Sequence, residues 1–424
     1  MTEPSGGVSM PRVHHPMSPL HPPRRGTNMT LKHIACLIAM TTALLAQGCA
    51  GPVRKEAVPA AFTDQAVIPG MADVRYRVGI DTEALQREGI ASVRREQAFL
   101  ASAGHRGGLP PAVFLAVSGG GDNGAFGAGL LNGWTAAGDR PEFKLVTGVS
   151  TGALIAPFAF LGPSHDEQLK RFYTTTGPAD IARQRSLLAA VTSDALADNA
   201  PLWQLVSREV NQSLLDAIAR EYEKGRLLFV ATVDLDARQT VLWNLTKIAA
   251  SKDPNALGLF RSLMIASASI PGAFPPVMID VEANGRAYQE MHVDGGTMSQ
   301  VFVYPPSLDI AALSRKLDTQ RERRAYIIRN ARLDPEWAQV DRRTMSIAGR
   351  AISSLIHTQG IGDLYRIYLT CQRDGVAFNL AYVPATFNAP HREEFDTEFM
   401  RALYKTGYEM AAKGYPWEKA PPGF

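Results

Sequence analysis

Two continuous apolar runs of strand length, each followed by a helical pattern, constrain the fold of this chain most. Residues 112–117 (AVFLAV) and 144–149 (KLVTGV) are each typical of a strand buried on both faces. Residues 125–137 and 151–161 are the predicted helices that follow them. A strand–helix–strand–helix order implies parallel strands joined by right-handed crossovers. We therefore predict an α/β fold in which a mainly parallel central sheet lies between layers of helices.

The rest of the chain continues this pattern, and its composition suits a large core. The 424 residues are 46% hydrophobic and 20% charged. The net charge of +3 is too small to argue for a nucleic-acid partner, and no long basic run is present. Further predicted elements are a hairpin at 227–233 and 240–245, strands at 325–329 and 376–383, and helices at 81–102, 203–222, 255–267 and 393–413.

The first fifty residues predict targeting rather than folding. Residues 1–28 are polar and Pro-rich, which predicts a disordered or untranslated lead. Residues 29–48 form a basic start and a short apolar run, as in a secretory signal peptide. The run ends at Cys49 in a sequence that resembles a bacterial lipobox, with a plainly cleaved signal as the alternative. We expect a lipid on Cys49. Ala50 after it favours the outer membrane, facing the periplasm, over retention at the inner membrane, and a secreted protein is the alternative.

The remaining boundaries follow from composition. Residues 49–108 are predicted to be a membrane-proximal leader, residues 109–414 the main domain and residues 415–424 a tail. Cys371 would be the only cysteine left in the folded protein, so no internal disulfide can form. No Cys/His cluster has zinc spacing, and we expect neither a metal nor a cofactor.

A glycine cluster joins the first predicted strand to its helix. Gly119, Gly120, Gly121 and Gly124 allow successive backbone N–H groups to turn outward at a helix N-terminus. Such a loop can hold a phosphate or the oxyanion of an acyl-transfer reaction. A dinucleotide-binding loop would need an acidic residue at the end of the second strand, and that strand ends at Ser150 instead.

The second strand ends in Gly148-Val-Ser150-Thr-Gly152, a pattern typical of a nucleophile elbow. Small residues on both sides of the serine relieve crowding in a strained strand-to-helix turn. The pattern also arises by chance, and the alternative interpretation is a tight turn without chemistry. Its position between a buried strand and an apolar helix favours the nucleophile.

A third motif, Asp294-Gly295-Gly296, supplies a carboxylate where another backbone can come close. Asp294 can accept the Ser150 proton if burial raises its pKa toward neutral pH. Taken by itself, Asp-Gly-Gly is more often a turn. His292 would share a face with Asp294 on a strand and could form a Ser–His–Asp arrangement, although a structural hydrogen bond beneath the site is the preferred interpretation.

Taken together and in this order, the three motifs resemble those of the patatin-like phospholipases. Residues 266–277 (ASASIPGAFPPV) and 399–408 (FMRALYKTGY) look like further blocks of that family, so the resemblance runs from about residue 112 to residue 414. It implies a patatin-like three-layer α/β fold and a Ser150–Asp294 dyad without a catalytic histidine. It also implies an oxyanion hole at Gly119, Gly120 and Gly121. Many members carry Lys or Arg where this chain has Asn123, which leaves the substrate's charge preference open.

We therefore expect a serine-dependent lipid acyl hydrolase that acts through an acyl-enzyme. The resemblance implies phospholipids, lysophospholipids or neutral acyl esters as substrates, at a membrane that the lipid anchor would reach. An acyltransferase that uses the same acyl-enzyme is one alternative. A catalytically idle envelope lipoprotein that binds lipid is the other.

Overall fold

The computed structural model describes residues 52–186 and 193–424. Residues 51–424 form one compact unit that contains the whole described core, so this segment is expected to fold by itself. The predicted lead, the signal peptide and Cys49 lie outside the described residues. Within the described part, no helix is both long enough and apolar enough to cross a membrane.

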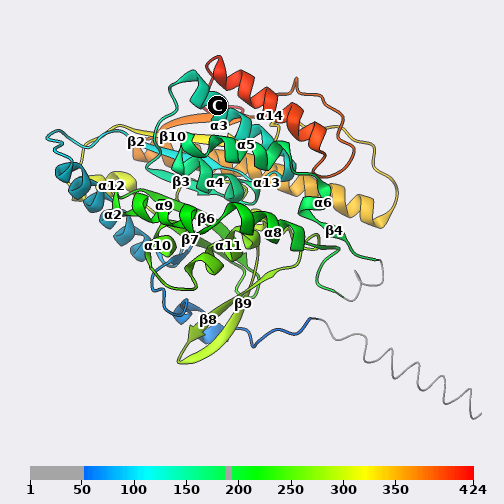
Figure 1. Ribbon diagram of the computed structural model, residues 1–424, viewed down its shortest axis with the longest axis horizontal. Helices are drawn as coiled ribbons and strands as arrows, with labels where there is room; N and C mark the ends of the chain where they lie inside the picture. Colours follow the sequence, from blue (N-terminus) through cyan, green and yellow to red (C-terminus); the bar gives the residue numbers. More distant parts are fainter. Residues whose placement is uncertain (1–51, 187–192) are drawn as a thin grey trace, which may run out of the picture. The chain divides into compact units, whose positions relative to one another are not determined.

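A nine-stranded sheet organises the fold (Figure 1). Strands β11, β10, β2, β3 and β6 lie side by side in this order and are parallel. Strands β7 and β1 continue the sheet beyond β6 in antiparallel pairing, and the β8–β9 hairpin also attaches to β6. The α/β class with a mainly parallel core of strands is thus confirmed.

The bounds of the elements follow. The strands of the large sheet are β1 (Arg75–Arg77), β2 (Ala112–Val117), β3 (Leu145–Gly148), β6 (Leu227–Asp234), β7 (Gln239–Asn244), β8 (Val277–Ala283), β9 (Arg286–Asp294), β10 (Arg323–Arg329) and β11 (Ala377–Tyr382). A small separate pair consists of β4 (Arg183–Gln184) and β5 (Ala197–Asp198). The α-helices are α2 (Thr82–Ser102), α3 (Gly124–Ala137), α4 (Thr151–Leu161), α5 (Asp166–Thr174), α6 (Pro178–Ile181), α8 (Ala200–Glu209), α9 (Gln212–Glu223), α10 (Leu245–Ala250), α11 (Ala256–Ser267), α12 (Ile310–Lys316), α13 (Thr344–Asp374) and α14 (Thr397–Ala412).

Side chains of the parallel strands alternate between two apolar cores, one on each face of the sheet. In β2, Val113, Leu115 and Val117 belong to the core on one face, and Phe114 and Ala116 to the core on the other. The first core includes side chains of α3, α4, α5, α8, α9, α11 and α14. The second includes side chains of α13. Burial on both faces explains why these strands are apolar throughout.

Most of the predicted elements are present within a residue or two. The exception is the helix expected over residues 203–222, which is divided into α8 and α9. Val210 ends α8, and the side chain of Asn211 accepts the N–H of Leu214 to begin α9. An Asn that caps a helix N-terminus competes with helix continuation, which explains the division.

Among the elements that were not predicted from the sequence are β1, the β8–β9 hairpin and the 31-residue helix α13. Strand β1 lies within the expected leader, yet it pairs with β7 and so extends the main sheet. Whether residue 109 begins a separable domain stays a prediction. In α11, Phe260, Met264 and Ile265 are fully buried and belong to the core.

Candidate active site

The predicted nucleophile lies in a strained turn between β3 and α4. Ser150 has φ 55° and ψ −125°, a conformation that L-residues rarely adopt. A Cβ on Gly148 would lie 2.4 Å from the carbonyl oxygen of Gly152, and a Cβ on Gly152 would lie 2.1 Å from that of Val117. Both flanking positions therefore require glycine. The backbone N–H of Ser150 donates to the Ser267 hydroxyl at 3.0 Å, which holds the turn on α11.

Strand β6 brings the serine and aspartate motifs together. Its first half, from Leu227 to Val230, pairs with β3, which leads directly into the serine turn. Its second half pairs on the same side with the end of β9, where Thr232 lies opposite Asp294. The two motifs are 144 positions apart in the sequence but follow one another along a single strand.

Asp294 is a buried carboxyl group with one hydrogen-bonded oxygen. Its Oδ1 accepts the Gly296 N–H at 2.7 Å, while the buried Oδ2 makes no hydrogen bond of ordinary geometry. Burial raises the pKa of Asp294 to about 7, although the Ser150 hydroxyl and the Gly296 amide both act to lower it. The serine is thus close enough to affect the carboxyl group without forming a tight bond, as is common in sites without substrate. A carboxyl that titrates near 7 suits a general base at neutral pH.

The glycine loop lies directly against Ser150. A Cβ on Gly119 would lie 3.1 Å from the Cβ of Ser150, closer than an ordinary contact, so a side chain at this position would crowd the serine. The Gly119 N–H is already used, because it donates to the carbonyl of Gln300 at 3.0 Å. Gly120 and Gly121 have φ 152° and 57°, and within the described residues their amides donate to no backbone carbonyl. Both amides are therefore without a backbone acceptor and next to Ser150 in the loop.

Two buried amide side chains that were not predicted as site residues hold this loop in place. Asn330, after β10, donates through Nδ2 to the Ser118 carbonyl at 2.9 Å and accepts the Gly127 N–H at 3.1 Å. Gln300 joins the two motifs, because its carbonyl holds Gly119 and its side chain donates to the Gly296 carbonyl at 2.7 Å. Neither residue lies in a motif, and both contacts link distant parts of the chain.

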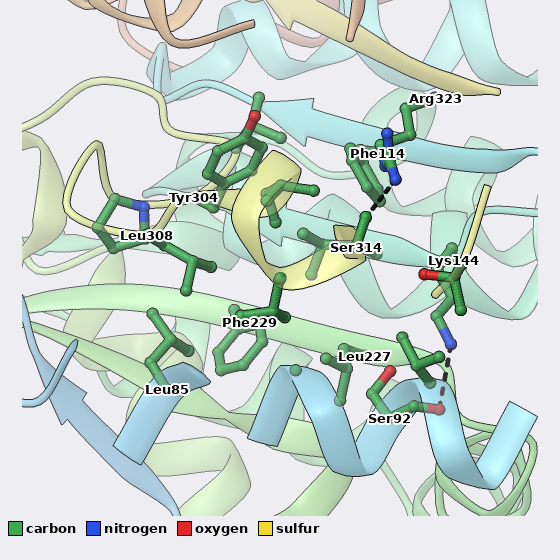
Figure 2. A pocket seen from close by; sticks show the side chains of 18 of the residues that line it. Leu85, Ser92, Phe114, Lys144, Leu227, Phe229, Tyr304, Leu308, Ser314 and Arg323 are labelled. Carbon is green, nitrogen blue, oxygen red and sulfur yellow. Dashed lines mark hydrogen bonds between the residues drawn. The ribbon is translucent and has the colours of Figure 1, made fainter. Parts of the chain in front are cut away.

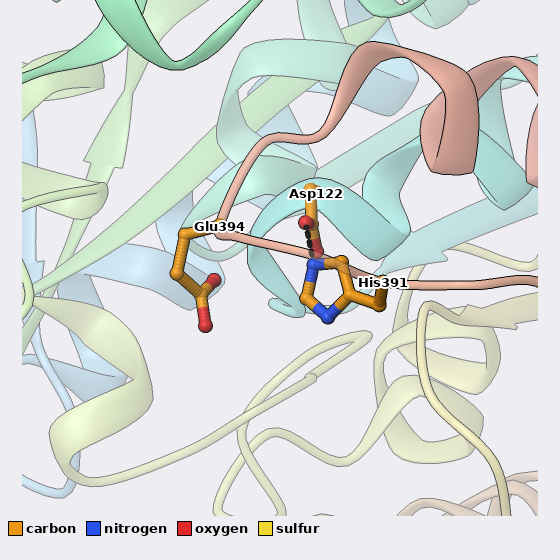
Figure 3. Close-up of side chains that lie close together, drawn as sticks. All are labelled: Asp122, His391 and Glu394. Atoms are coloured by element: carbon orange, nitrogen blue, oxygen red, sulfur yellow. Dashed lines mark hydrogen bonds and ion pairs between the residues drawn. The ribbon is translucent and has the colours of Figure 1, made fainter.

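On its other side, the loop is fixed to the segment before α14 (Figure 3). Oδ2 of Asp122 accepts the Phe395 N–H at 2.9 Å and lies 2.7 Å from Nε2 of His391, with Glu394 nearby. Within the described ranges, Asp122, His391 and Glu394 form the one group with spacing suited to a metal ion. The buried oxygen of Asp122 is already bonded to protein groups, so these contacts attach the glycine loop to the segment before α14. They explain the position of the three side chains without a metal ion.

His292 does not take part in a Ser–His–Asp arrangement. Its Nδ1 lies 2.8 Å from the Thr232 hydroxyl, and its Nε2 lies 3.0 Å from Oε2 of Glu290. Both ring nitrogens are thus occupied, and neither contacts Ser150 or Asp294. Arg75 also binds Glu290, and burial among these partners fixes the ring beneath the site. The structural interpretation of His292 agrees with this geometry.

An apolar cavity of about 110 Å³, shown in Figure 2, is not lined by Ser150. Its lining includes Leu227 and Arg323, the first residues of β6 and β10, together with Lys144 just before β3. These positions mark the amino ends of the parallel strands, whereas Ser150 follows a carboxyl end. The cavity is therefore not the place where an ester reaches Ser150.

Comparison with known proteins identifies the family of this site. The family described as patatin-like phospholipase matches residues 115–306, a range that includes the glycine loop, Ser150 and Asp294. No curated protein matches the chain by sequence. Among solved structures, VipD from Legionella pneumophila is similar, with 12% identity and a TM-score of 0.35 over 72% of this chain and 66% of VipD, just under two thirds of its length. Residues 115–306 of this chain therefore match the patatin-like phospholipases, a family of hydrolases.

Proposed function

We propose that this chain is a serine lipid acyl hydrolase that uses a Ser150–Asp294 dyad. The observation that carries the proposal is the pairing of a strained, glycine-flanked serine with a buried carboxyl whose pKa lies at about 7. A structural turn has no use for either feature, because both a positive φ at serine and a buried, half-bonded carboxylate destabilise the fold. The family match supports hydrolysis of a lipid ester.

In the proposed reaction, Oγ of Ser150 attacks the ester carbonyl while Asp294 accepts its proton. The amides of Gly120 and Gly121 donate to the oxygen that becomes negatively charged. Asp294 then returns the proton to the departing alcohol, which leaves an acyl group on Ser150. Water, deprotonated by Asp294, attacks this acyl-enzyme. Asp294 then returns the proton to Oγ of Ser150 as the acyl–oxygen bond breaks and the carboxylic acid is released.

The expected contributions to this reaction can be stated group by group. Each oxyanion donor is expected to contribute about 3–4 kcal/mol, and the general base a factor of roughly 10² to 10⁴. The Gly119 amide donates to Gln300, so we assign the oxyanion hole to Gly120 and Gly121 and give Gly119 the role of close approach to Ser150. Esters of membrane lipids, of phospholipase A, lysophospholipase or general esterase type, are the proposed substrates.

Hydrolysis of short-chain nitrophenyl esters and mixed phospholipids by residues 51–424 tests the proposal. We expect turnover by the wild type and losses of several orders of magnitude for Ser150→Ala and for Asp294→Asn. Ser164→Ala, which removes an exposed hydroxyl, serves as the matched control. A wild type that is as inactive as the two dyad variants would reject the hydrolase function and favour a lipid-binding protein. Acyl products that form only when an acceptor lipid is added would show a transferase.

We also propose that Cys49 carries a lipid and holds the protein at the cell envelope. The proposal rests on the lipobox-like sequence alone. Mass spectrometry of the protein purified from membranes should show an acylated N-terminal Cys49, and Cys49→Ser should release the protein into the soluble fraction. A mature N-terminus at any other residue would contradict it.

A further inference from the structure

The first half of α13 exposes large apolar side chains to solvent. Met345 is 71% exposed, Ile352 55% and Leu355 70%. The second half of the same helix behaves differently, because Leu364 and Ile367 are buried in the core. Figure 1 shows the start of α13, in yellow, at the right of the view beyond the helices that cover the sheet. Several exposed apolar residues in one segment need an explanation that single ones do not.

Most of the exposed apolar side chains form a stripe along one side of the helix, and Ile347, 54% exposed, lies outside it. The apolar positions follow a spacing of three or four residues, and polar residues with the same spacing occupy the opposite side. The stripe consists of Met345, Ala348, Ile352, Leu355 and Ile356. The polar side consists of Arg343, Ser346, Arg350, Ser353 and His357. An amphipathic helix of this kind lies on the surface of another body, with its apolar side buried.

Three arginines without an ion pair and an exposed indole lie near the stripe. Arg342, Arg343 and Arg350 form no ion pair with any described residue, and Arg350 donates instead to the Glu336 carbonyl. Trp337, just before the helix, is 87% exposed. An apolar stripe with arginines on the polar side of the same helix and a tryptophan at one end is typical of a helix that lies in the interface of an anionic membrane.

The same helix reaches the catalytic machinery. Asp363 accepts the backbone N–H of Gln300 at 2.6 Å, and Gln359 accepts a bond from the Gln300 side chain at 3.3 Å. Gln300 in turn holds Gly119 and the Gly296 turn. At 1.5 Å per residue, Met345 lies about 21 Å along the helix from Gln359. The stripe therefore begins next to the site and extends away from it.

We propose that the first half of α13, together with Trp337, binds the surface of an anionic lipid bilayer and so brings the catalytic site to lipid. The benefit to catalysis rests on the proposed hydrolase function, but the binding itself does not. A second copy of this chain is the less favourable occupant. Near the stripe Asp334 and Glu336 pair with Arg332, so the three arginines without an ion pair outnumber the one remaining acid, Asp341, and two such surfaces would repel. Anionic lipid headgroups complement the arginines, and the acyl region accepts the apolar stripe.

Sedimentation with sucrose-loaded vesicles tests the proposal on residues 51–424 carrying Ser150→Ala, so that hydrolysis cannot change the vesicles. Vesicles of phosphatidylcholine with 30% phosphatidylglycerol are compared with pure phosphatidylcholine. We expect the triple variant Met345→Ser, Ile352→Ser, Leu355→Ser to bind at least tenfold more weakly. Replacing Arg342, Arg343 and Arg350 with Gln should remove the preference for anionic vesicles, by about fivefold per arginine at low salt.

The matched control is Ile80→Ser, which removes an exposed apolar side chain that is 51% exposed on another part of the protein. It should bind as the parent does. Vesicles should also shift the tryptophan emission to shorter wavelength, and Trp337→Phe should abolish that shift. Circular dichroism and thermal unfolding establish that each variant is folded.

Binding that the triple variant retains in full would overturn the proposal. A parent that is dimeric by light scattering and becomes monomeric in the triple variant would also overturn it, because the stripe would then be a protein interface. Vesicle binding that depends on α13, in a wild type that hydrolyses no ester, would reject the hydrolase and leave this inference standing. A wild type that hydrolyses soluble esters but does not bind vesicles would support the hydrolase and reject this inference.

Discussion

Replacing the buried base should make the protein more stable while it destroys activity. Burial raises the Asp294 pKa from its ordinary 3.8 to about 7. At about 1.4 kcal/mol per pKa unit, holding this carboxylate ionised in the folded state costs about 4 kcal/mol. Asp294→Asn removes the charge and keeps an oxygen that can accept the Gly296 N–H. We therefore expect the variant to be inactive and more stable than the wild type at pH 8.

The pH dependence gives this prediction its sign. The unfolded chain releases the Asp294 proton near pH 3.8, whereas the folded chain keeps it until about pH 7. Between these values the unfolded state binds fewer protons, so the stability of the wild type falls as the pH rises and then levels off above 7. Asparagine does not titrate. The stability advantage of Asp294→Asn should therefore grow by about 2–3 kcal/mol from pH 5 to pH 8.

Urea unfolding of both proteins at pH 5, 6, 7 and 8, followed by circular dichroism, measures this difference. Asp139→Asn is the control, because Asp139 is exposed and its surroundings change little on unfolding. A difference between wild type and Asp294→Asn that is the same at pH 5 and pH 8 would refute the reasoning. So would a wild type that gains stability relative to the variant as the pH rises.

Four further predictions concern catalysis. The value of kcat/KM should fall about tenfold per pH unit below pH 7, because only ionised Asp294 can accept the proton, and a pH–rate profile without that limb would contradict the assignment. His292→Gln should lose about 1–3 kcal/mol of stability in urea but keep kcat within tenfold, whereas a loss as large as that of removing the nucleophile would make His292 catalytic. Asn330→Ala should lower kcat by roughly 10- to 100-fold with little change in KM for a soluble ester, because two bonds that hold the glycine loop are lost, and an unchanged kcat would count against that role. Gly120→Ala should reduce kcat by at least roughly 100-fold, since its Cβ would lie 2.2 Å from the Asn330 carbonyl oxygen. Gly258→Ala is the control: nothing lies within 4 Å of its added Cβ, so its kcat should equal that of the wild type.

The features that could be predicted from the sequence are those set by neighbours in the chain. Gly148 and Gly152 flank Ser150, so the five-residue motif alone predicts the turn that they permit. The residues of β2 are apolar throughout rather than alternately apolar and polar, which likewise indicates a strand buried on both faces. The approach of Asp294 to Ser150 was accessible only through the family resemblance, because it depends on β6 pairing with both β3 and β9.

Residues that act through distant contacts could not be found from the sequence. Asn330 bonds to Ser118 across 212 positions, and no local pattern marks it. Helix α13 was missed for another reason. Its first half is apolar on a side exposed to solvent, and its second half buries a different set of residues, so the whole helix lacks one consistent apolar face.

Covalent labelling with an alkyl fluorophosphonate tests the central claim most directly. The probe reacts with an activated serine in a stable mimic of the acyl-enzyme, and peptide mass spectrometry shows which residue carries it. The account predicts one modification on Ser150, none in Ser150→Ala, and labelling slowed by roughly 10²-fold or more in Asp294→Asn. Labelling of another serine, or of Ser150 at an unchanged rate in Asp294→Asn, would contradict the Ser150–Asp294 dyad.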